Sequence, residues 1–148
     1  NKTLVLTTTN GTRLLHMALE KGAKEIITGA FSNLDAVCQY LEQKKMPVVL
    51  ACAAWKDKLN IEDTLFAGAV INRMREHFSI HCDASAMAAN MYTLANPNLY
   101  DFMKDNNASH YLRLTGFGLE KDIRHCLTAN TAPVLPVYQQ GSLVKANI

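Results

Sequence analysis

The sequence predicts an α/β fold, with three α/β/α layers around a mixed, largely parallel sheet and a C-terminal β-hairpin. Two observations predict the layers: apolar runs alternate with amphipathic helical patterns in the first half of the chain, and Pro47–Ala53 is apolar throughout. A run of this kind is typical of a strand covered on both faces. The order strand–helix–strand–helix–strand favours parallel strands joined by right-handed crossovers.

The elements of the first half follow from residue periodicity and from helix-end signals. Gly22 is expected to end the first helix, and Ser32 is expected to cap the second. The strands are expected at Thr3–Thr8, Glu25–Ala30 and Pro47–Ala53, and the helices at Thr12–Lys21 and Leu34–Lys44.

The second half is predicted to be mainly helical, with a hairpin at Pro133–Ala146 around Gln140-Gly141-Ser142. The small residues Ala67-Gly68-Ala69 predict a close approach of one helix to the sheet. Residues 1–148 are expected to form a single domain. The helices are expected at Ile61–Phe78, Ala84–Leu94, Leu99–Lys104, His110–Thr115 and Leu119–Leu127.

Composition excludes several classes of function. The net charge of +2 is too small to indicate nucleic-acid binding. No apolar run approaches the ~20 residues that a membrane span needs. The four cysteines have no C-x-x-C spacing, which predicts reduced, mostly buried thiols and a cytoplasmic protein: Cys38, Cys52, Cys82 and Cys126.

A polar turn between the first strand and the first helix is the leading candidate for ligand binding. Its hydroxyl, amide and guanidinium groups, with the free N–H groups of a helix N-terminus, suit a phosphate or sulfonate. The alternative is that Thr9 or Asn10 only caps the helix and Gly11 only makes a turn. The candidate binding residues are Thr8, Thr9, Asn10, Gly11, Thr12 and Arg13.

Ligands in parallel sheets bind at the carboxyl ends of the strands. The loops at those ends are therefore expected to converge on one pocket. They are Thr8–Gly11, Ala30–Asn33 and Ala53–Lys58.

Three acids are candidates for catalysis and for binding magnesium: Glu62, Asp63 and Asp83. Magnesium prefers oxygen ligands, and one or two carboxylates suffice because the ion keeps several waters. The structural alternative is that acids in a first helical turn only complement the helix dipole, and that Asp83 is only an N-cap.

Ser109-His110 is not a nucleophile–base pair, because adjacent residues in a helix rarely point at each other. His110 is a candidate phosphate donor or general acid.

Leu6-Thr7-Thr8-Thr9-Asn10-Gly11-Thr12-Arg13 resembles the TTNGT signature of the 2-phosphosulfolactate phosphatase family. Further family motifs follow in the same order over nearly the whole chain. They are Phe31-Ser32-Asn33, Cys52-Ala53-Ala54-Trp55, Ile61-Glu62-Asp63-Thr64-Leu65, Ala67-Gly68-Ala69, Asp83-Ala84, Ser109-His110, Gly118-Leu119, Asp122-Ile123 and Pro136.

The resemblance implies a magnesium-dependent phosphatase that hydrolyses the phosphate monoester of 2-phosphosulfolactate, or of a related phosphorylated hydroxy acid, on the route to coenzyme M. It implies a small-molecule substrate, no nucleic acid and no membrane, and it is compatible with a homo-oligomer. Asp63 and Glu62 would hold magnesium or orient water, with Asp83 as a third acid.

The sequence also departs from the family. The family usually has glycine where this chain has Ala54, and Gly-Arg where this chain has Tyr-Leu-Arg after His110. No residues match the Asp-x-Leu-Arg-Ala-type segment that family members carry before TTNGT. The chain is therefore expected to be a fragment of a longer phosphatase, and the alternative is a domain that binds an anionic small molecule without turning it over.

Overall fold

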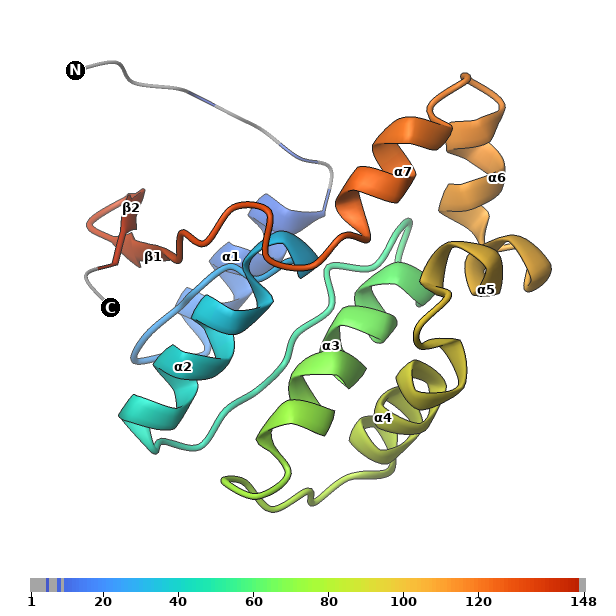
Figure 1. The fold of residues 1–148 in the computed structure, drawn as a ribbon. Helices are drawn as coiled ribbons and strands as arrows, with labels where there is room; N and C mark the ends of the chain where they lie inside the picture. Colours follow the sequence, from blue (N-terminus) through green and yellow to red (C-terminus); the bar gives the residue numbers. More distant parts are fainter. Residues whose placement is uncertain (1–4, 6–7, 9, 147–148) are drawn as a thin grey trace.

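The computed structural model describes residues 5, 8 and 10–146. Most of the predicted first strand, Thr3–Thr8, lies outside these residues, and so does Thr9. The described part contains seven α-helices, one 3-10 helix and a two-stranded antiparallel sheet (Figure 1). A mixed α/β composition is thus confirmed, while the three layers around a largely parallel sheet stay a prediction.

The helices occur in the predicted order, and most of their ends lie within a residue or two of the predicted ones. α1 ends where Gly22 adopts a left-handed φ of +75°, as expected of a glycine that follows a helix. The elements are α1 (Gly11–Glu20), the 3-10 helix η1 (Phe31–Asn33), α2 (Leu34–Lys44), α3 (Ile61–Met74), α4 (Asp83–Ala95), α5 (Leu99–Asp105), α6 (Ser109–Thr115), α7 (Glu120–Cys126), β1 (Pro136–Gln139) and β2 (Ser142–Lys145).

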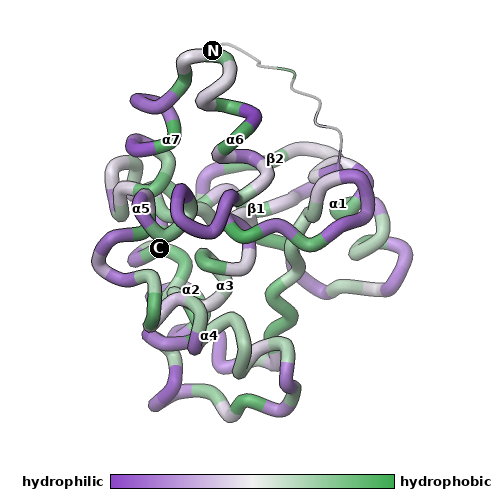
Figure 2. The backbone as a smooth tube through the Cα atoms, turned by 90° about the vertical axis from the view of Figure 1, so that its right-hand side faces the viewer, coloured by the Kyte–Doolittle hydropathy of each residue, from purple (hydrophilic) through white to green (hydrophobic). Residues whose placement is uncertain are grey.

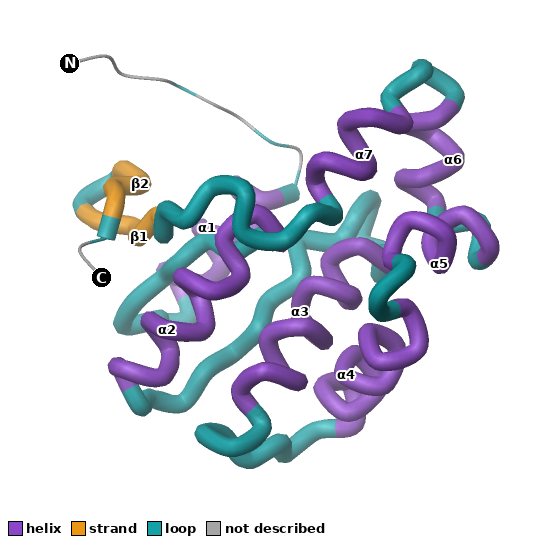
Figure 3. The backbone as a smooth tube through the Cα atoms, in the orientation of Figure 1, coloured by secondary structure: helices purple, strands orange, loops and turns teal. Residues whose placement is uncertain are grey.

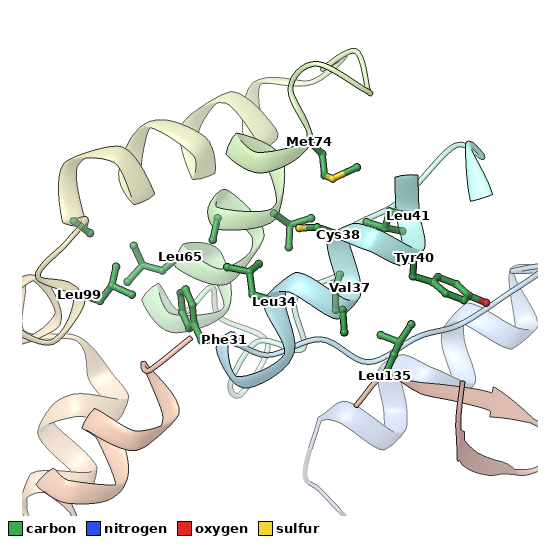
Figure 4. Packing of buried hydrophobic residues seen from close by; sticks show 14 of the residues in the cluster. Phe31, Leu34, Val37, Cys38, Tyr40, Leu41, Leu65, Met74, Leu99 and Leu135 are labelled. Atoms are coloured by element: carbon green, nitrogen blue, oxygen red, sulfur yellow. The ribbon is translucent and has the colours of Figure 1, made fainter. Parts of the chain in front are cut away.

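The main core lies between α2 and α3 (Figure 4). Both helices bury an apolar stripe, and Leu34 of α2 and Leu65 of α3 are almost completely buried. Leu135, which precedes β1, is also fully buried in this cluster. The C-terminal hairpin segment therefore contributes to the same core as the two helices.

Gly68, the central small residue of α3, packs against α4 and not against a sheet, so that part of the prediction was wrong. α3 and α4 run side by side (Figure 1). A Cβ added to Gly68 would lie 2.1 Å from the carbonyl oxygen of Ala88. The backbone of α4 occupies the space that a side chain at position 68 would need, and this explains the glycine.

The segment between α2 and α3 is extended, as predicted for Pro47–Ala53, but it forms no ladder with the rest of the described chain (Figure 3). The expected burial on both faces was wrong, because Val49 is 89% exposed. An apolar run of this kind indicates that the residues favour an extended backbone. It does not indicate whether another strand pairs with the segment, because such a partner lies elsewhere in the chain.

The predicted strand Glu25–Ala30 forms a single antiparallel bridge, between Ile27 and Val137 of β1. The N–H of Thr28 donates to the carbonyl of Pro136 at 3.0 Å. The predicted hairpin is confirmed, with β1 and β2 paired around the turn at Gly141.

The buried Asn33 ties the start of α2 to the C-terminal segment. Its Oδ1 accepts the N–H of Ala30 at 2.8 Å, and its Nδ2 donates to Thr28 at 3.2 Å and to Val134 at 2.9 Å. The loop at Ala30–Asn33 is therefore committed to structural hydrogen bonds.

Within the described residues, no helix combines the length and hydrophobicity that a transmembrane span requires. Figure 2 shows hydrophilic and hydrophobic residues alternating along the chain.

The four cysteines are all free, in agreement with reduced thiols. The prediction that they are mostly buried was wrong: Cys38 is buried, whereas Cys52, Cys82 and Cys126 are exposed.

Candidate functional site

The turn before α1 is organised by Thr8. Its Oγ1 accepts the backbone N–H of Thr12 at 3.0 Å, so this hydroxyl satisfies one of the free donors of the helix N-terminus. A Cβ on Gly11 would lie 2.8 Å from the same oxygen. Gly11 thus permits the close approach of Thr8, whereas the side chain of Asn10, one of the two residues considered as the cap, makes no capping hydrogen bond.

Asn10 points its side chain across to the loop that precedes α3. Its Nδ2 donates to the carbonyl oxygen of Ala54 at 2.8 Å. The N–H of Ala54 donates in turn to Oδ2 of Asp63 at 3.1 Å. The two peptide groups of Ala54 therefore link Asn10 of the polar turn to Asp63 of α3, and both side chains lie at one site.

The loop that joins them is a tight turn in an unusual conformation. Trp55 and Lys58 exchange two backbone hydrogen bonds of 2.9 and 3.0 Å, and Lys56 and Asp57 between them have φ values of +51° and +58°. Positive φ at both central residues defines a type I′ turn, which favours Asn and Gly. Ala54 also has a positive φ, +61°. Such strain in non-glycine residues concentrates at functional sites.

Arg13 forms an ion pair with Asp57 at 2.8 Å. Both side chains are largely exposed, so the pair adds little stability. Its effect is to attach α1 to the type I′ turn, and the guanidinium of Arg13 is already partnered.

A second group of side chains surrounds Trp55, beside this turn. Nδ1 of His110, on α6, contacts Oε1 of Glu62, on α3. Both carboxylate oxygens of Glu62 are buried, and they form no other polar contact with the described residues. The rings of Trp55 and His110 lie 5.3 Å apart. Burial lowers the pKa of His110, and the positive charge of Arg113 lowers it further.

Two cations lie over the Trp55 ring. Nζ of Lys56 is 4.6 Å from the ring centre, and Cζ of Arg113 is 5.7 Å from it. Neither forms an ion pair within the part of the chain that the structure describes. Trp55 is therefore surrounded by two cations and by His110, which in turn contacts Glu62.

Asp83 lies away from this group. It begins α4, which follows the C-terminal end of α3, whereas Glu62 and Asp63 lie in the first turn of α3 (Figure 1). α3 has 14 residues, which corresponds to about 21 Å at 1.5 Å per residue. The antiparallel packing of α3 and α4 puts its helix start at the opposite end, so the structure does not bring Asp83 to the other two acids.

The structure thus brings together most of the candidate residues on the polar turn with Glu62, Asp63 and His110. Thr9 lies outside the described residues. The roles of all these residues in binding and catalysis stay predictions. No group of three or more His, Cys, Asp or Glu side chains among the described residues could hold a metal ion. Sequence reasoning did not single out Trp55 and Lys56 as site residues, and the only signal for Arg113 was its place in the departure from the family pattern.

Comparison with known proteins identifies the family of this chain. The family described as 2-phosphosulpholactate phosphatase matches residues 1–141 of the chain. The chain belongs to the 2-phosphosulfolactate phosphatase family. The family resemblance seen in the sequence motifs is therefore confirmed over nearly the whole chain.

Curated relatives carry the same name. The chain is 34% identical over 143 residues to a "Probable 2-phosphosulfolactate phosphatase" of Caldanaerobacter subterraneus subsp. tengcongensis, covering 95% of this chain and 57% of that protein. Proteins of the same printed name from Thermotoga petrophila and Clostridium botulinum are 35% and 30% identical, over 97% and 98% of this chain and 60% of each relative. The chain spans less than two thirds of the length of these relatives.

Proposed function

We propose that the protein of which this chain forms part is a phosphoric monoester hydrolase that acts on 2-phosphosulfolactate or a related phosphorylated hydroxy acid. The observation that carries the proposal is the double link through Ala54, which joins Asn10 to Asp63. A neutral hydrogen-bonding turn and an acid at one site are what phosphate-ester hydrolysis needs. The family named by the relatives supports the reaction type.

The cations support a substrate with more than one acidic group. Lys56 and Arg113 flank Trp55, on the side of the site formed by α6 and the type I′ turn. Asn10 and Thr12 lie at the start of α1. A phosphoryl group bound by one set leaves the other for a carboxylate or sulfonate of the same molecule, because arginine and lysine both bind such anions well.

Magnesium is part of the proposal, and Asp63 is the residue that fits it. Oδ2 of Asp63 accepts the Ala54 N–H, and Oδ1 forms no hydrogen bond with the described residues. Magnesium is commonly bound through one or two carboxylates together with substrate phosphate and water, so a single available oxygen is sufficient. The ion would neutralise charge on the phosphoryl oxygens.

The chain's own residues supply orientation. Asn10 is fixed by its bond to Ala54, and Asp63 is fixed by the same residue, so neither group must reorganise when the substrate binds. Uncatalysed hydrolysis of phosphate monoesters is among the slowest of biological reactions, so preorganised charge stabilisation is the main requirement. We assign the protein to the cytoplasm, because its free cysteines suit a reducing compartment.

The test is phosphate release from 2-phosphosulfolactate, with and without magnesium, by the wild type and by Asp63→Asn. The amide keeps an oxygen that can accept the Ala54 N–H but removes the negative charge. We expect a loss of about a hundredfold in kcat/KM. Glu76→Gln, an exposed acid beyond the far end of α3, is the matched control and should retain full activity. Equal rates in all samples would contradict the assignment.

The alternative is a domain that binds an anionic small molecule without hydrolysing it. The observation that favours it is the chain's 57–60% coverage of the relatives' length. Stabilisation against heat by 2-phosphosulfolactate, with no phosphate release from this chain but with release from a full-length relative, would support this alternative.

A further inference from the structure

The segment between α2 and α3 has a free backbone within the described part of the chain. Residues 46–53 run extended from the end of α2 to the loop at Ala54 (Figure 3). Their N–H and C=O groups form no backbone hydrogen bond with any described residue. A row of free donors and acceptors on an extended backbone is what another β-strand pairs with.

The side chains of this segment cover the core on one face only. Leu50 is partly buried against the cluster between α2 and α3, whereas Val49 beside it is 89% exposed. Successive side chains of an extended chain point to opposite faces, so the face that carries Val49 is open. Natural proteins protect a free edge with charged side chains or proline. Residues 46–53 carry no charge, and Pro47 is their single proline.

α1, which adjoins the end of this segment, is also incompletely covered. Its apolar stripe contains Leu14, Leu15, Ala18 and Leu19, and none of these side chains is buried. The hydrogen bond from Asn10 to Ala54 ties the start of α1 to the end of the segment. Two apolar surfaces that adjoin at Ala54 therefore lack a covering layer in the described structure.

We propose that a β-strand from the part of the phosphatase outside this chain pairs with residues 48–53 and covers Val49. The lengths of the relatives support a partner in the same protein, because about two fifths of each relative lies outside the match. In such pairing the main-chain hydrogen bonds supply affinity, and the apolar side chains supply specificity. The added strand would also hold Ala54, which links Asn10 to Asp63.

This inference shares one premise with the proposed function, namely that the chain belongs to a longer protein, but it does not depend on the reaction. Amide hydrogen exchange of the full-length protein and of this chain alone tests it. We expect residues 48–53 to exchange about a hundredfold more slowly in the full-length protein than in this chain. The amides of α3 around Val70, which is buried, should be protected in both samples and show that both are folded. Fast exchange of residues 48–53 in the full-length protein would overturn the proposal.

Val49→Lys tests the open face. A charge placed under the added strand should weaken the pairing and make residues 48–53 of the full-length protein exchange about tenfold faster, with little effect on this chain alone. Gln43→Lys is the matched control, because it adds the same charge at an exposed position of α2 and should change neither sample. An unchanged exchange rate in full-length Val49→Lys would contradict the proposal.

A photocrosslinker identifies the occupant. With p-benzoylphenylalanine in place of Val49 in the full-length protein, we expect crosslinks within one molecule to a peptide outside residues 1–148. Crosslinks to residues 1–148, or between two copies of the protein, would overturn the proposal. An inactive full-length protein with the expected crosslink would contradict the proposed function and leave this inference intact. Phosphate release without the crosslink and without protection would do the reverse.

Discussion

The contact of α3 with α4 at Gly68 gives the most direct test of the fold, through the variant Gly68→Ala. The added methyl group would lie 2.1 Å from the Ala88 carbonyl oxygen, 2.7 Å from its carbon and 2.8 Å from Cβ of Tyr92. The shortest carbon–oxygen contacts in proteins are about 3.3 Å, so the helices must separate by roughly 1.2 Å. The obstacle is backbone, which cannot rotate away.

The expected cost follows from two opposing effects. Alanine is about 1 kcal/mol better than glycine in a helix interior. Overpacking a filled interface typically costs about 1–3 kcal/mol, and the upper end applies here because the obstacle is backbone and the buried neighbours Leu65 and Ala69 would also lose contacts. We expect a net loss of about 2 kcal/mol, which for a chain of this size lowers Tm by about 4–8 °C.

The assay is thermal and urea unfolding of the wild type, Gly68→Ala and Gly11→Ala. Gly11 is the matched control, because its added Cβ would meet the Thr8 hydroxyl, a side chain that can rotate. Its loss should be about 1 kcal/mol, the value of one hydrogen bond. A Tm of Gly68→Ala equal to or above that of the wild type would refute the packing argument.

Three further predictions concern the strained turn, the thiols and the acid sensitivity. Ala54→Gly should stabilise the protein by about 0.5–1 kcal/mol in urea unfolding, because relief of a left-handed φ outweighs the added chain entropy; destabilisation would contradict this. Cys82 should react before Cys38 with a thiol reagent, since a serine hydroxyl lowers the pKa of Cys82 and burial raises that of Cys38 to about 11; the reverse order would be inconsistent with the structure. A hydrogen bond from Tyr40 lowers the pKa of Glu25 below its ordinary 4.5, so the stability it adds is present above that pH and is lost as the pH falls through the folded-state value. Tyr40→Phe should therefore reduce the loss of stability in acid, and an unchanged acid transition would rule out this linkage.

Local pattern was sufficient for the helices. α2 begins and ends where its periodicity predicts, at Leu34 and Lys44, because a helix is specified by residues a few positions apart. The pairing of extended segments is non-local. Pro47–Ala53 reads as a buried strand, yet Val49 is exposed in the described structure, since the apolar run does not specify what covers it.

The candidate site also has features that local sequence predicts and features that depend on the packing of distant segments. The sequence identified Asn10, Asp63 and Glu62 as polar residues at the ends of predicted elements, which local signals can show. It did not predict that Glu62 meets His110, because that contact depends on how α6 is placed against α3. The family's glycine at position 54 was a usable signal, since the φ of Ala54 is one that glycine adopts without strain.

The hydrogen bonds of Asn33 have a consequence for synthesis of the protein. One partner of its amide, Val134, lies 101 positions further along the chain. The segment around Asn33 cannot complete its interactions on the ribosome until Val134 has emerged. Until then the face of α2 that Leu135 covers is open to solvent, and the nascent chain carries an apolar surface that chaperones recognise.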